Sequence, residues 1–171
     1  ERSDEFLGAT HGRDVRSRAE LALDAGGRIL AMRIRALANV GAYATPTGVA
    51  IQLLIGPWVQ TSVYDIPVID FEFRAILTHT TTTGAYRGAG RPEAIYLTER
   101  VLDAAARRLG IGQAELRRRN MIRPGQMPYR NAMGQTYDSG RFESIMDQAL
   151  ALADWNGFDA RLADSTARGR L

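Results

Sequence analysis

A glycine-rich decapeptide is the part of this sequence best suited to bind a ligand. Residues 84–93 read GAYRGAGRPE, with glycines at positions 84, 88 and 90. Glycine adopts positive φ angles and lets the backbone approach a ligand closely, and Pro92 suits the first turn of a following helix. The main-chain N–H groups of such a loop and helix start favour anionic oxygens. The pattern therefore predicts an anion-binding loop, although it matches neither the dinucleotide motif G-x-G-x-x-G nor a Walker loop.

The other reactive side chains do not form a catalytic set. The sequence contains no Cys and no Lys, which excludes thiolate nucleophiles, iron–sulfur ligation and Schiff-base chemistry within these residues. His11 and His79 are too far apart in sequence to suggest a pair of metal ligands. Asp65, Glu72 and Glu93 are isolated acids without a paired carboxylate. We therefore predict no catalytic residue and no direct metal ligand in this segment.

Together with the loop, three further short segments resemble one enzyme family. Residues 85–93 resemble the cofactor loop of the large subunit of molybdenum hydroxylases, which include xanthine dehydrogenase, aldehyde oxidoreductase and bacterial carbon monoxide dehydrogenase. Residues 62–67 (SVYDIP), 116–122 (LRRRNMI) and 137–140 (YDSG) are similar to other landmarks of that family and follow the family order. The resemblance covers roughly the whole chain, and four ordered matches are far more specific than one glycine motif.

This resemblance implies a cofactor site at the loop. The main chain of Ala85, Tyr86, Arg87, Gly88 and Ala89 would lie against a molybdenum cofactor, either molybdopterin or molybdopterin cytosine dinucleotide. Arg87 could instead brace the turn by bonding nearby carbonyls, and Tyr86 could be buried beside the glycine turn. The catalytic Glu of the family and a second Gly-rich loop are expected outside these residues. Residues 1–171 are therefore expected to be a fragment of the molybdenum cofactor-binding domain, inactive on its own.

Three positions depart from known members of the family and bear on the substrate. Carbon monoxide enzymes carry a Cys that bridges copper to molybdenum at the position matching Gly88, and no soft Cu(I) ligand exists here. Several xanthine and aldehyde enzymes place an aromatic residue at the position matching Ala89. Ile55 falls where xanthine enzymes have a purine-binding Arg. We therefore expect an aldehyde or N-heterocycle as substrate rather than carbon monoxide or a purine, with Ile55 and Ala89 lining the pocket.

The resemblance also implies the nature of the parent protein. It would be an oxidoreductase that hydroxylates its substrate with water-derived oxygen and works with iron–sulfur and FAD subunits or domains. Two alternatives remain open: a non-catalytic scaffold, and a stand-alone anion- or nucleotide-binding module that retains the loop. A flanking Gly-rich loop and a downstream Glu motif in the gene would favour the enzyme.

Composition limits the partners. With 45% hydrophobic and 24% charged residues among 171, the chain is typical of one globular domain. Its pI of 9.7 could indicate a nucleic-acid partner, but 19 acidic residues are interspersed. We interpret the one tight basic run, Arg117–Arg119, as a solvated or interdomain face. No apolar run approaches the ~20 residues that span a membrane. We expect no nucleic-acid or membrane partner and a cytoplasmic location, with the periplasm as the alternative.

The first half of the chain predicts strands. Polar and apolar residues alternate on both sides of residues 24–27 (DAGG), which predicts a hairpin whose second strand continues to Tyr43. The same alternation predicts a strand over residues 69–77. Between these strands, the apolar residues 49–55 predict a short buried helix that Gly56 and Pro57 would end.

The second half predicts helices that would place the loop. Apolar residues recur at helical spacing over residues 94–109, and Gly110 follows as a helix end. A shorter helix is predicted over 113–119, and a third, capped by Asp138 or Ser139, over 142–152. Strands followed by helices predict an α+β fold, with antiparallel strands in the N-terminal half, within a larger molybdopterin-binding domain.

Overall fold

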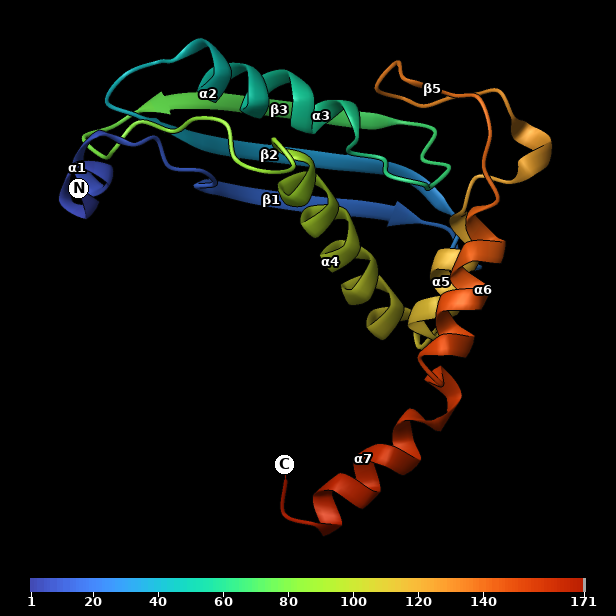
Figure 1. The fold of residues 1–171 in the computed structure, drawn as a ribbon. Helices are drawn as coiled ribbons and strands as arrows, with labels where there is room; N and C mark the ends of the chain where they lie inside the picture. Colours follow the sequence, from blue (N-terminus) through green and yellow to red (C-terminus); the bar gives the residue numbers. More distant parts are fainter. Residues whose placement is uncertain (171) are drawn as a thin grey trace.

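The computed structural model describes residues 1–170 and consists of a three-stranded sheet followed by helices (Figure 1). Strands β1 (Val15–Leu23) and β2 (Ile29–Gly41) form an antiparallel hairpin. In its turn, Asp24 Oδ1 accepts the N–H groups of Gly26 and Arg28, at 2.9 and 2.8 Å. The predicted hairpin and the α+β class, with strands before helices, are confirmed, and β2 ends at Gly41.

Strand β3 (Ile69–Leu77) pairs with the other edge of β2, and this pairing is parallel. The sheet is therefore mixed, with one antiparallel and one parallel pair. Parallel neighbours need a crossover connection. Residues 42–68 provide it through helix α2 (Pro46–Ala50), the π-helical turn η1 (Ile51–Ile55) and the short helix α3 (Gly56–Trp58).

The prediction that Gly56 and Pro57 would end the buried helix is wrong, since the helical run continues to Trp58. The N–H of Gly56 donates to the carbonyl of Ile51, five residues back. Pro57 lies at the start of α3, where its missing N–H costs no hydrogen bond. The wider π turn thus joins two short helices that a regular α-helix would not join across a proline.

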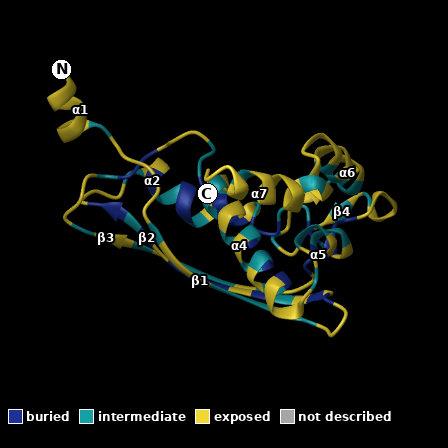
Figure 2. Ribbon diagram, turned by 90° about the horizontal axis from the view of Figure 1, so that it is seen from below, coloured by how far each residue is buried: buried dark blue, intermediate teal, exposed yellow. Residues whose placement is uncertain are grey.

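One face of the sheet forms the core. Alternate residues of β2 are buried there, as the period of two in a strand requires (Figure 2). Helix α4 (Arg91–Leu109) packs over this face, with Leu102 and Ala106 fully buried. The buried strand residues are Met32, Ile34, Ala36, Ala38 and Val40.

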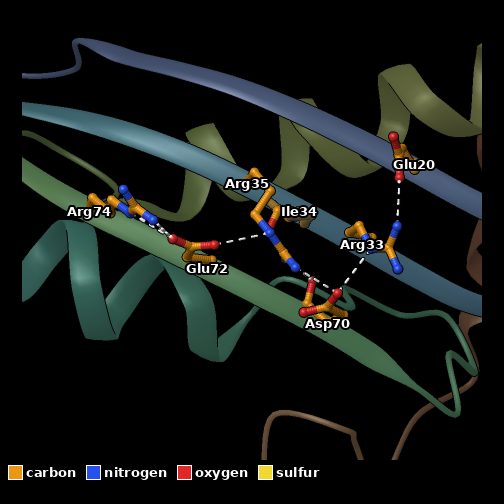
Figure 3. A network of polar contacts seen from close by, with 7 residues as sticks. All are labelled: Glu20, Arg33, Ile34, Arg35, Asp70, Glu72 and Arg74. Atoms are coloured by element: carbon orange, nitrogen blue, oxygen red, sulfur yellow. Dashed lines mark hydrogen bonds and ion pairs between the residues drawn. The ribbon is translucent and has the colours of Figure 1, made fainter.

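The opposite face of the sheet carries a network of ion pairs (Figure 3). Arg33 Nε lies 2.9 Å from Asp70 Oδ2, and Arg35 Nη2 lies 2.7 Å from the same oxygen. Arg35 Nε also lies 3.1 Å from Glu72 Oε2. Hydrogen bonds from Arg35 and then Arg33 hold the pKa of Asp70 below its ordinary value. These exposed pairs connect β2 to β3 across the parallel pairing, although each contributes little stability in water.

The basic run lies at the end of helix α5 (Gln113–Asn120), where Arg119 is exposed and Arg117 and Arg118 are half-buried. Each of its guanidinium groups binds a carboxylate of this chain, so the run links α5 to α4 and to helix α6 (Phe142–Leu152). Close approach in the folded chain, rather than sequence spacing, creates most of these contacts. The pairs are Arg117–Glu99, Arg117–Asp103, Arg118–Glu143, Arg118–Asp147 and Arg119–Glu115.

Asn120 lies at the centre of the junction between the sheet and the helices. This side chain is 2% exposed, accepts the N–H of Ile29 at 2.8 Å, and donates to the carbonyls of Gly27 and Leu116 at 2.8 and 2.9 Å. Its main-chain carbonyl accepts the N–H of Asp65 at 2.8 Å. The family landmarks at 62–67 and 116–122 therefore meet here, where they hold elements together.

Helix α6 and the residues after it extend away from the sheet (Figure 1). The N-cap of α6 is Arg141, so the prediction of Asp138 or Ser139 as its cap is wrong. The Ser139 hydroxyl bonds its neighbour Asp138 instead, and Phe142 starts the helix with its ring edge-on to that of Tyr137. No helix within residues 1–170 is long and apolar enough to cross a membrane. The remaining elements are α1 (Arg2–Gly8), η2 (Pro124–Gln126), β4 (Tyr129–Arg130), β5 (Thr136–Tyr137), η3 (Trp155–Gly157) and α7 (Phe158–Ala167).

Candidate cofactor-binding loop

Residues 84–90 form a compact loop that leads directly into helix α4. Gly88 and Gly90 adopt left-handed φ angles of 92° and 85°, which glycine tolerates without steric cost. The N–H of Ala89 donates to the Tyr86 carbonyl at 2.8 Å, and that of Arg91 donates to the Gly88 carbonyl at 3.0 Å. Two overlapping turns therefore shape the loop, as the glycine spacing predicts.

The loop rests on the π-helical turn of the crossover. A Cβ atom added to Gly90 would lie 2.8 Å from the Ile51 carbonyl oxygen and 3.0 Å from Gly56 Cα. Glycine is therefore needed at position 90 for two reasons: its left-handed φ angle and the lack of space for a Cβ atom. Ile55 is half-buried and adjoins Gly56, so it belongs to the element on which the loop rests. Its contribution to a substrate pocket stays a prediction.

The loop presents main-chain donors that have no partner within the chain. Among residues 1–170, no acceptor is found for the N–H groups of Ala85, Tyr86, Arg87, Gly88 and Gly90. The side chains of Tyr86 and Arg87 are exposed, and Gly88 and Ala89 are half-buried. A cluster of unpaired N–H groups beside the start of a 19-residue helix favours an anionic ligand.

The exposure and contacts of the Tyr86 and Arg87 side chains bear on the alternative roles proposed for them. Tyr86 is 61% exposed, so the interpretation as a buried aromatic is wrong. Within residues 1–170 the Arg87 side chain makes no hydrogen bond or ion pair that would brace the turn. Two other arginines provide that support: Arg13 Nη2 donates to the Arg87 carbonyl, and Arg91 Nη1 lies 3.4 Å from the Gly88 carbonyl oxygen.

Arg13 and Glu93 are functional candidates that the sequence alone did not identify. Arg13 Nε lies 3.3 Å from Glu93 Oε1, and the Arg13 guanidinium lies over the ring of Tyr86, 4.6 Å from its centroid. Glu93 Oε2 and Thr83 Oγ1 are buried without a hydrogen-bond partner among residues 1–170. Because 74 residues separate Arg13 from Arg87, no local pattern could have connected them.

The two histidines lie in different surroundings. His11 pairs with Thr83 through the main chain, in parallel orientation, and His79 is exposed. Within residues 1–170 no three His, Cys, Asp or Glu side chains come together as a metal site. The ligand-binding potential of the loop therefore lies in its N–H groups and neighbouring guanidinium groups.

The chain is similar to several known proteins over nearly its whole length. The chain is 29% identical over 172 residues to the nicotine 6-hydroxylase large subunit of Paenarthrobacter nicotinovorans, covering 99% of this chain and 21% of that protein. It is 33% identical over 173 residues to the carbon monoxide dehydrogenase large chain of Afipia carboxidovorans, covering 98% and 21%. The crystal structure of quinoline 2-oxidoreductase from Pseudomonas putida 86 superimposes with a TM-score of 0.91 at 34% identity, covering 99% and 22%.

These relatives are much longer than the chain, which spans about a fifth of their length. The sequence model of the family described as "Molybdopterin cofactor-binding domain" matches residues 1–121. That match includes the loop, the crossover on which it rests, and the helix that follows it. The chain therefore belongs to the molybdopterin cofactor-binding domain family.

Proposed function

We propose that this chain is the cofactor-binding segment of a molybdenum hydroxylase large subunit. The observation that carries the proposal is the loop at 84–90, in which the N–H groups of Ala85, Tyr86, Arg87, Gly88 and Gly90 have no acceptor within residues 1–170. The alternative of a stand-alone anion-binding module is disfavoured, because nearly the whole chain aligns with one segment of larger subunits. A non-catalytic scaffold would have no need of the free donors.

The residues present fit such a cofactor. The main chain of Ala85, Tyr86, Arg87, Gly88 and Ala89 would hold its anionic oxygens, and the cytosine dinucleotide form is the one proposed for this protein. When bound, the molybdenum of the cofactor would supply the two-electron redox chemistry that no side chain of this segment can perform. The protein's own contribution is to bind and orient the cofactor through fixed backbone donors.

The proposed substrate is an N-heterocycle, with an aldehyde as the second choice. Relatives of the chain include proteins named nicotine 6-hydroxylase large subunit and quinoline 2-oxidoreductase. Gly88 offers no thiolate to bridge copper, which argues against carbon monoxide oxidation. Ile55 provides no cation to stabilise negative charge on a purine. Removal of one such stabilising group typically lowers the rate roughly 10²–10³-fold. Ala89 leaves space beside the loop for a bulkier ring.

The parent would act in a complex. One oxygen atom from water would enter the substrate, and the two electrons released would pass to iron–sulfur and FAD subunits or domains. Several relatives are named as subunits or chains of larger enzymes. We place the complex in the cytoplasm.

The test uses the full-length subunit purified with its partner subunits. Molybdenum and pterin should be present at about one per subunit, and the enzyme should oxidise members of a panel of quinolines, pyridines and aldehydes. Carbon monoxide should give no turnover, and xanthine little. A preparation that never contains molybdenum would contradict the proposed function, whereas efficient xanthine turnover would contradict only the placement of Ile55.

A further inference from the structure

Arg13 contacts three different parts of the candidate site at once. Its guanidinium donates through Nη2 to the Arg87 carbonyl and lies over the Tyr86 ring, 4.6 Å from the centroid. Its Nε lies 3.3 Å from Glu93 Oε1 in the first turn of α4. The Arg13 and Glu93 side chains are 36% and 17% exposed, so water only partly screens this pair. Arg13 thus links the loop to the helix that follows it.

The backbone around Arg13 is itself attached to the loop. The N–H of His11 donates to the Thr82 carbonyl at 3.0 Å, and the N–H of Gly84 donates to the His11 carbonyl at 2.8 Å. A Cβ atom on Gly12 would lie 2.8 Å from Tyr86 Cβ, so the two segments are in close contact. Arg13 has a φ angle of 62°, which a non-glycine residue rarely adopts. This segment therefore directs the Arg13 side chain at the loop.

The contact with the Arg87 carbonyl determines the direction of the next N–H group. The peptide bond between Arg87 and Gly88 is trans, since the one cis bond within residues 1–170 is Met127–Pro128. In a planar trans peptide the C=O and N–H groups point in opposite directions. Because Arg13 holds the Arg87 carbonyl, the Gly88 N–H is directed away from Arg13, and no acceptor is found for it among the described residues.

We propose that Arg13 is a positioning residue that orients the Gly88 N–H toward the anionic oxygens of the cofactor. This inference rests on the proposed function of the loop. Glu93 supports it by holding the guanidinium from the side of α4, and the Tyr86 ring restricts the guanidinium from above through a cation–π contact. A lysine at position 13 would retain the charge but would lack the planar guanidinium, which contacts Glu93 and the Arg87 carbonyl at the same time.

The experiment compares Arg13→Met, Arg13→Lys and Glu93→Gln in the full-length subunit with its partners. Arg16→Met is the matched control, because Arg16 is a nearby exposed arginine with no ion pair or side-chain hydrogen bond in the described part of the chain. Hydrogen exchange of the Gly84 and Ala89 N–H groups, the two in the loop that are bonded within the chain, should accelerate roughly tenfold or more in Arg13→Met, the ratio expected for loss of one charge-assisted hydrogen bond. The lysine and Glu93→Gln variants should lie between Arg13→Met and the wild type, and Arg16→Met should match the wild type.

Two further readouts separate positioning from a purely structural role. Molybdenum content should fall in Arg13→Met while the thermal midpoint of the complex changes no more than in Arg16→Met. The Mo(V) electron paramagnetic resonance signal of the remaining loaded sites should change in shape, whereas a residue that only stabilises the fold would lower its amplitude. Wild-type exchange, molybdenum content and signal shape in Arg13→Met would overturn the inference. If the wild type holds no molybdenum, the proposed function fails, and the exchange comparison still tests whether Arg13 orders the loop.

Discussion

Gly90 and Gly110 flank helix α4 and both adopt left-handed φ angles, 85° and 64°, but their surroundings differ. A side chain at Gly90 would collide with the backbone of Ile51 and Gly56, which cannot move as a flexible side chain could. A Cβ atom at Gly110 would meet nothing within 4 Å. The pair therefore separates the cost of a strained backbone angle from the cost of crowding.

We expect Gly90→Ala to destabilise the fold far more than Gly110→Ala. The left-handed angle alone should cost roughly 1–2 kcal/mol in Gly110→Ala, and crowding should bring Gly90→Ala to about 2–5 kcal/mol in total. Chemical denaturation of both variants, compared with the wild type, measures the two losses. Equal losses would show that the loop does not pack on the π-helical turn as described.

The candidate site could be predicted from the sequence only where its residues are contiguous. The loop at 84–90 has its own signature of glycines and a following proline, so Gly88, Gly90 and Pro92 were identified from sequence alone. Arg13 is an ordinary arginine before a strand, and its role arises only because His11 pairs with Thr83 in the folded chain. Contacts between distant segments leave no periodic pattern to detect.

At the scale of elements, one buried side chain connects the hairpin to helix α5. The buried Asn120 side chain makes three hydrogen bonds, with the main chain of Ile29, Gly27 and Leu116. Replacing it with Ala removes the side-chain partner of the Ile29 N–H and of the Gly27 carbonyl, at ~1–3 kcal/mol for each unsatisfied group. We expect Asn120→Ala to lower the free energy of unfolding by about 3 kcal/mol or more.

The control for that substitution is Asn156→Ala. Asn156 is exposed, and its side chain makes no hydrogen bond within residues 1–170, so its loss should stay within about 0.5 kcal/mol. Urea unfolding of both variants provides the comparison. A loss in Asn120→Ala as small as that in the control would mean that the junction is not held by this side chain.

The attachment of α6 to α5 should depend on pH. A hydrogen bond from Arg118 holds the pKa of Asp147 below its ordinary value of 3.8. A carboxyl group whose pKa is lower in the folded state stabilises that state above its ordinary pKa, and this contribution is lost as pH falls through the lowered value. The melting temperature of Asp147→Asn should therefore be below that of the wild type at pH 6, and the two should converge as the pH falls below the lowered pKa of Asp147.

An Arg118→Met background is the control for this prediction. With the guanidinium removed, Asp147→Asn should have a small effect at pH 6, as a double-mutant cycle requires. A difference at pH 6 that is as large in the Arg118→Met background as in the wild-type background would argue against the ion pair.

Periodicity predicted the elements well, because α4 and β2 each bury one face and β1 and β3 each have a face that is partly buried against the core. It could not predict how strands pair, since a period of two is the same in parallel and antiparallel neighbours. The π-helical turn was missed for a similar reason: the Gly56–Pro57 pair is a common helix end, and only contact with β3 and with the loop makes continuation favourable.

At the scale of the whole molecule, the last helices form an arm that leaves the sheet (Figure 1). Several of its apolar side chains are exposed. Five of these lie on α6, η3 and α7, and exposed apolar side chains that gather on one segment often mark an interaction surface. Since the chain spans about a fifth of its relatives, we propose that other parts of the parent subunit cover this arm. The residues are Ile145 (63% exposed), Leu152 (90%), Trp155 (48%), Phe158 (53%) and Leu162 (39%).

We therefore expect the isolated 171-residue chain to self-associate and to be catalytically inert. Its loop alone should bind free cofactor weakly or not at all, because one segment supplies few of the contacts. Sedimentation velocity should show association that the double variant Leu152→Glu, Trp155→Glu reduces. Tight stoichiometric binding of the cofactor in isothermal titration calorimetry would contradict the expectation of weak binding.

The parallel pairing of β2 with β3 has a consequence for the order of folding. The hairpin of β1 and β2 closes through local contacts, whereas β3 can join only after residues 42–68 have formed a closed loop, which costs chain entropy. The contact between Arg13 and Arg87 closes a still longer stretch of chain. During synthesis, Arg13 can therefore contact the binding loop and Glu93 only after residues 84–93 have left the ribosome.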